Sequence, residues 1–81
     1  MLKIETKTKL SPEEAINQAV RFFGPDGRGL KVKEQAPRYA YFEGGGGGVH
    51  VIACVEEKQT SVELESREWD FQVKEFIEKI H

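Results

Sequence analysis

The chain has 81 residues, of which 38% are hydrophobic and 32% charged, a composition typical of one small globular domain. Its 12 basic and 14 acidic residues are mixed along the sequence, which excludes the one-signed field that attracts nucleic acid or anionic lipid. The single cysteine excludes an internal disulfide, and no segment is apolar enough to span a membrane. We expect one cytoplasmic domain over residues 1–81 that binds neither nucleic acid nor membrane.

The N-terminal segment alternates apolar or threonine residues with charged ones, which predicts a half-buried strand over residues 2–10. A helix is predicted to begin at Ser11, which can accept the amide of Glu14, because Pro12 suits the first helical position. The apolar stripe of this helix ends before the turn over residues 24–27, and its members are Ala15, Ile16, Ala19, Val20 and Phe23.

Four further strands are predicted between that turn and a C-terminal helix. The stretches GLKVKEQ and RYAYFE are rich in β-formers and are separated by Pro37. VHVIACVEE and TSVELES both alternate, and the short EKQ segment between them predicts a hairpin. The segment SREWDFQVKEFIEKIH predicts an amphipathic helix capped by Ser66, with Trp69 and Phe71 packed against the sheet.

The predicted element order is β-α-β-β-β-β-α. Links as short as those between the four consecutive strands exclude parallel pairing, so the sheet should be antiparallel. We predict an α+β fold with a five-stranded sheet of strand order 1-5-4-3-2 and both helices packed on one face.

This arrangement resembles the TATA-binding-protein-like architecture and, in shortened form, the helix-grip fold of the Bet v 1/START-like superfamily. The stretch EGGGGGVHV is similar to the glycine-rich loop between two central strands of Bet v 1-like proteins, although the lysine common there is absent. The chain also lacks the second and third helices that help those proteins enclose a cavity. The resemblance implies the fold and, more weakly, a ligand function.

The five glycines over residues 44–48 admit three interpretations: a hairpin turn, the lip of a ligand site, and a nucleotide-binding loop. A phosphate-binding loop leads from a strand into a helix and ends in Gly-Lys-Ser/Thr, whereas this run leads into another strand. We therefore predict the turn.

Metal and nucleophile chemistry are both disfavoured by spacing. His50 and Cys54 stand four positions apart on one strand, about 13 Å, too far to share an ion or to act as a nucleophile pair. We expect no metal and no cofactor.

Apolar residues fall on both faces of the central strands, so the face away from the helices is not fully polar. We predict that Phe42, Ile52 and Cys54 form a surface buried by a second subunit, and the alternative is ordinary scattered exposure of apolar residues. DNA binding on the open face is disfavoured because acidic residues interleave there with lysines, namely Glu5, Glu56, Glu63 and Glu65.

The function predicted from these features is that of a noncatalytic binding or interaction module. It would either hold a small apolar ligand between helix and sheet or form a homodimer through the sheet. The predicted ligand-binding residues are Tyr39, Tyr41, Gly46 and His50. The alternative is an enzyme resembling START-like cyclases and hydratases, with a pocket near Tyr39, Tyr41 and His50.

Overall fold

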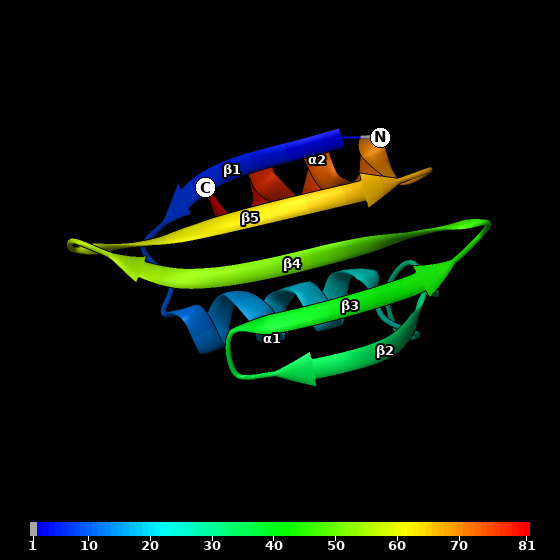
Figure 1. Cartoon of the computed structure of the whole chain (residues 1–81), viewed down its shortest axis with the longest axis horizontal. Coiled ribbons are helices and arrows are strands. Elements are labelled where there is room, and N and C mark those ends of the chain that lie inside the picture. Colours follow the sequence, from blue (N-terminus) through cyan, green and yellow to red (C-terminus); the bar gives the residue numbers. More distant parts are fainter. Residues whose placement is uncertain (1) are drawn as a thin grey trace.

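The computed structural model describes residues 2–81 and has the predicted order of elements (Figure 1). The strands are β1 (Leu2–Thr8), β2 (Lys31–Ala36), β3 (Tyr39–Gly44), β4 (Gly47–Glu56) and β5 (Gln59–Arg67). The helices are α1 (Pro12–Phe23) and α2 (Asp70–Ile80). The strands pair antiparallel in the order β1-β5-β4-β3-β2, which confirms the predicted α+β class and topology.

Both helices cover the same face of the sheet, as Figure 1 shows with the strands in front. Helix α1 contacts β3, β4 and β5, while α2 contacts β5 and β1. Within residues 2–81 no helix lies over the opposite face, which we call the open face. Neither helix within residues 2–81 has the length and apolar content needed to cross a bilayer.

The start of α1 follows the predicted chemistry. The Ser11 hydroxyl accepts the N–H of Glu14 at 3.2 Å, and Pro12 occupies the first turn. A serine at this position stabilises a helix by about 1 kcal/mol relative to alanine. The helix ends at Gly24, whose N–H donates to the carbonyl of Val20.

The core lies between the helices and the sheet, and three phenylalanine rings form its centre. The ring of Phe23 lies 5.5 Å from that of Phe42 and 5.3 Å from that of Phe76, measured between centroids. Alternate residues of the central strands complete this layer: Ala40, Val49, Val51, Ala53, Val62 and Leu64. The layer between helices and sheet is thus filled by apolar side chains.

One predicted interface residue belongs to this core. Phe42 is 0% exposed and pairs across the sheet with Val49, which also faces the helices. The prediction that Phe42 shares an outer surface with Ile52 and Cys54 is therefore wrong. Side chains alternate along a strand, so Ala40 and Phe42 point to the core while Tyr39 and Tyr41 point to the open face.

The C-terminal helix differs from its prediction at its start. It begins at Asp70, with Trp69 in the cap position, and Ser66 is still within β5. Ser66 accepts the N–H of Trp69 at 3.2 Å and donates to Asp70 at 2.9 Å, so it braces the strand-to-helix bend. Phe71 was expected in the core but is 69% exposed, because residues two apart lie on different sides of a helix and Val73 is buried.

The glycine run forms a hairpin turn between β3 and β4, as predicted. Gly44 pairs with Gly47, leaving Gly45 and Gly46 as a two-residue turn with φ of +57° and +82°. Positive φ at both central positions is the requirement of a type I′ hairpin, which favours glycine. The indole N–H of Trp69 donates to the Gly44 carbonyl at 2.9 Å and ties this hairpin to the start of α2.

Candidate functional site

Aromatic and apolar side chains gather on the open face over β3 and β4. The register places Tyr39 beside Ile52 and Tyr41 beside His50. Cys54 follows on the same face of β4 and is exposed. We call these five residues the open-face patch. Ile52 is 43% exposed, because neither helix of residues 2–81 covers it, so the patch presents apolar surface to solvent.

Hydrogen bonds and ring contacts hold the patch in place. The Tyr39 hydroxyl and Nε2 of His50 share a hydrogen bond of 3.1 Å, and the Tyr41 ring meets His50 edge-on at 4.4 Å. The Tyr41 hydroxyl donates to Glu43 at 3.0 Å. Desolvation raises the pKa of Tyr39 above its ordinary value of 10.0, and Glu34 and Tyr41 add to the rise. Tyr39 is thus a neutral hydroxyl at physiological pH.

The predicted ligand-binding residues are only partly brought together. Tyr39, Tyr41 and His50 are neighbours, but they lie on the open face, so they cannot line a site between helix and sheet. Gly46 stands apart at the tip of the hairpin, in a separate depression with Glu43. Ligand binding by these residues, and the enzyme that would use the same pocket, remain predictions.

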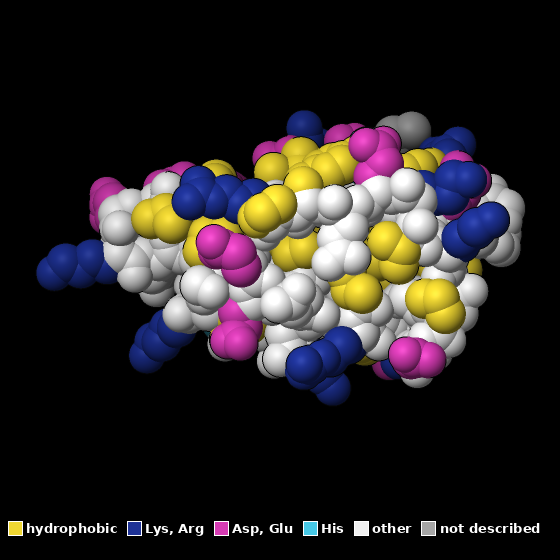
Figure 2. Space-filling view, turned by 90° about the horizontal axis from the view of Figure 1, so that it is seen from below, with side chains coloured by type: hydrophobic (Ala, Val, Ile, Leu, Met, Phe, Trp, Pro, Cys, Tyr) yellow, Lys and Arg dark blue, Asp and Glu magenta, His cyan; other side chains and the backbone are white. Residues whose placement is uncertain are grey.

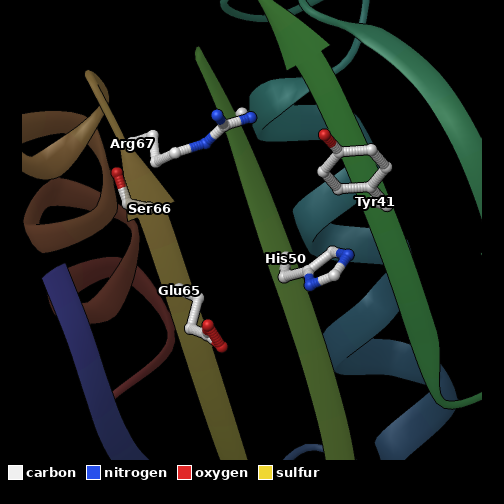
Figure 3. Close-up of a pocket in the computed structure, with 6 residues that line it drawn as sticks. Tyr41, His50, Glu65, Ser66 and Arg67 are labelled. Atoms are coloured by element: carbon white, nitrogen blue, oxygen red, sulfur yellow. The ribbon is translucent and has the colours of Figure 1, made fainter. Parts of the chain in front are cut away.

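A shallow depression of about 230 Å³ lies beside the patch, where Gly48 leaves a gap in the row of side chains. Its lining comprises Tyr41, Gly48, His50, Glu65, Ser66 and Arg67. Figure 3 shows Arg67 reaching from β5 over β4 towards the Tyr41 side, with Glu65 lower on β5 beside His50. A β-carbon at Gly48 would lie 3.2 Å from the Tyr41 ring, so glycine permits this arrangement.

Sequence reasoning did not single out Gly48 within the glycine run and did not find Arg67, and it placed Glu65 only among the acidic residues of the open face. The register of β5 on β4 places these residues in the site, because it pairs Glu65 with His50 and Arg67 with Gly48. Cross-strand neighbours of this kind become visible only once the pairing of β4 with β5 is known.

The β5 and β1 side of the open face carries charges of both signs. Lys3 lies 3.7 Å from Glu63, and Lys7 pairs with Glu56. The edge of the molecule that lies lowest in Figure 1, on the β2 side, also shows basic, acidic and hydrophobic side chains interspersed (Figure 2). The open face therefore has an aromatic and apolar half over β3 and β4 and a charged half over β5 and β1.

The comparisons with known proteins concern the fold. No protein-family model and no curated protein matches the chain. It is similar to the solution structure of the Aha1 dimer from Colwellia psychrerythraea, with a TM-score of 0.59 and 16% identity. The similarity covers 99% of this chain and 96% of that one. At this identity the likeness shows a shared fold alone, which supports the helix-grip-like element order predicted from the sequence.

Proposed function

We propose that the chain is a noncatalytic interaction module that forms a homodimer through the open face of its sheet. The observation that carries the proposal is the open-face patch, in which Ile52 is exposed and the rings of Tyr39 and Tyr41 are half-buried, on a face that neither helix of residues 2–81 covers. A patch of this kind on a small protein is typical of an interaction surface. The similar fold from Colwellia psychrerythraea was solved as a dimer, which adds support for self-association.

The size of the open face suits a dimer. Five strands spaced about 4.8 Å apart, the longest with ten residues at about 3.4 Å each, give a face of at most about 24 by 34 Å. A stable interface buries about 800 Å² on each partner. A partner that covered the whole open face would bury an area of this order, and it would shield the patch of this 81-residue chain from water.

A small ligand in the depression beside the patch is the second candidate. It is favoured by the gap at Gly48 between the Tyr41 ring and the charged groups of Glu65 and Arg67. Because a partner subunit would cover the same face, such a ligand would compete with the dimer.

The dimer is tested by Ile52→Glu. This change places a charge in the middle of the patch, where burial against a partner would leave it unpaired. We expect sedimentation equilibrium at about 100 μM to show a dimer for the wild type, and the variant to have a dissociation constant at least about tenfold higher.

Phe71→Glu is the matched control, because Phe71 is another exposed apolar residue but lies on α2, away from the open face. It should leave the dimer intact. A wild type that stays monomeric would refute the proposal. Loss of the dimer in Phe71→Glu but not in Ile52→Glu would place the interface on the helices instead.

A further inference from the structure

The side chains of the open face lie in rows that run across the sheet, because paired residues on neighbouring strands share a face. One row holds Lys31, Glu43, Gly48 and Arg67. The next row runs from β2 to β1 and holds Glu34, Tyr41, His50, Glu65 and Lys3. The third row contains Tyr39, Ile52, Glu63 and Glu5.

The charges in the first two rows are arranged oppositely on the two sides of β4. In the first, the acid Glu43 stands on β3 and the base Arg67 on β5. In the second, the acid Glu34 stands on β2 and the base Lys3 on β1, the two outermost strands. Reversing the two rows end to end would set Arg67 opposite Glu43 and Lys3 opposite Glu34.

We propose that two copies pack open face to open face about a two-fold axis that runs along β4. This inference rests on the proposed function and specifies its geometry. Such an axis reverses every row, so β3 lies over the partner's β5 and β2 over the partner's β1. Glu43 then faces the partner's Arg67, and Glu34 faces the partner's Lys3. Each contact occurs twice, as a two-fold interface requires.

The centre of the same arrangement is formed by β4. The axis sets Ile52 against the partner's Ile52, Cys54 against the partner's Cys54 and His50 against the partner's His50. On either side, Tyr39 and Tyr41 lie opposite the partner's Glu63 and Glu65. The Tyr39 hydroxyl can donate to the partner's Glu63 when Nε2 of His50 supplies the proton of the bond between them, whereas the Tyr41 hydroxyl already donates to Glu43.

Arg67 has the reach that this contact needs. It makes no ion pair within 4 Å to another side chain of residues 2–81, although Glu43 and Glu65 stand in neighbouring positions of the face. Because Gly48 has no side chain, the guanidinium extends over β4, close to the proposed axis (Figure 3). In the dimer the guanidinium turns back over β5 to meet the partner's Glu43, which moves it away from the partner's Arg67 and displaces no internal partner.

The other two-fold arrangement, with its axis across the strands, is less favourable. It stacks each strand on its own copy. With the axis at His50, Glu65 lies against the partner's Glu65, and with the axis at Ile52, Glu63 lies against the partner's Glu63. Like charges placed together in an interface oppose association. The axis along β4 avoids both contacts.

Charge reversal tests the axis. Arg67→Glu and Glu43→Arg each create two like-charge contacts, so each should raise the dimer dissociation constant at least about tenfold in sedimentation equilibrium. The double variant Glu43→Arg/Arg67→Glu restores opposite charges across the axis. Its dissociation constant should return to within about threefold of the wild-type value.

Arg28→Glu is the matched control, since it makes the same charge reversal away from the open face, where Arg28 pairs with Glu75 at 3.1 Å. It should leave the dimer unchanged. If the wild type is a dimer that Ile52→Glu disrupts, but the single reversals have no effect or the double variant stays weak, the axis along β4 is wrong while the open-face interface stands. A monomeric wild type would remove both proposals.

Cross-linking at Cys54 gives a second readout that needs no substitution. Packed sheets are about 10 Å apart, so a thiol-reactive linker of about that length should join the two Cys54 residues in solution. Cys54 is the single cysteine, so every linked product reports this position. Absence of the product under conditions where the protein is dimeric would contradict an axis along β4.

Discussion

Gly47→Ala should lower the free energy of unfolding by about 3 kcal/mol or more, because its β-carbon has no space. Built on the backbone, that atom would lie 2.0 Å from the carbonyl oxygen of Arg67 on β5. A main-chain oxygen within a paired strand cannot move aside as a flexible side chain would. The total stability of a domain is on the order of 5–15 kcal/mol, so urea denaturation should show a much lower midpoint.

Gly46→Asn is the control for this prediction. Gly46 has φ of +82°, a region that asparagine tolerates better than other residues, and a β-carbon there meets nothing within 4 Å. We expect a loss below about 1 kcal/mol. Equal losses in the two variants would show that the strand register around the hairpin is not as described.

Phe42→Ala should destabilise the protein by about 3–5 kcal/mol, the usual range for removing a buried phenylalanine. The ring is 0% exposed and packs on Phe23 of α1, so its removal leaves a cavity in the centre of the core. Denaturant titration of a dilute sample measures this loss without a contribution from dimer formation.

Ile52→Ala provides the comparison on the other face of the sheet. In the same dilute sample this substitution should lower the free energy of unfolding by less than about 1 kcal/mol. Ile52 is 43% exposed, so shortening its side chain removes little buried apolar area. If Ile52→Ala were as costly as Phe42→Ala, the assignment of the two faces would be reversed.

The strands and their order were predictable because alternation and short links leave few alternatives. In β4, Val49 and Val51 alternate with His50 and Ile52, and the structure separates these pairs onto the core face and the open face as expected. The start of α1 was equally clear, because Ser11 and Glu14 form a local signal that depends on no distant contact.

The face of Phe42 was not predictable from β3 alone. Its sequence Tyr39-Ala40-Tyr41-Phe42 is apolar at both sets of alternate positions, so alternation defines two faces without saying which one is buried. The pairing of Phe42 with Val49 shows that Phe42 is on the buried face. That pairing follows from the two-residue turn at Gly45 and Gly46.

The charged rows of the open face were hidden for the same physical reason. Glu43 and Arg67 are 24 positions apart in the sequence and become neighbours of Gly48 only through the register of three strands.

The exposure of Phe71 was not predictable for a different reason. It is one of several apolar residues in the segment that forms α2. Only the packing of α2 against the sheet shows that Val73 and Phe76 are on its buried side.

The central claim, that the open face is the surface of self-association, is tested most directly by isotope-filtered NMR on an equal mixture of labelled and unlabelled protein. In such a sample, nuclear Overhauser effects between the two labelling states arise only between subunits. We predict contacts from the methyl groups of Ile52 to the partner's Ile52 or Tyr39. Intersubunit contacts that arise from Phe71 on α2, with none from Ile52, would contradict it.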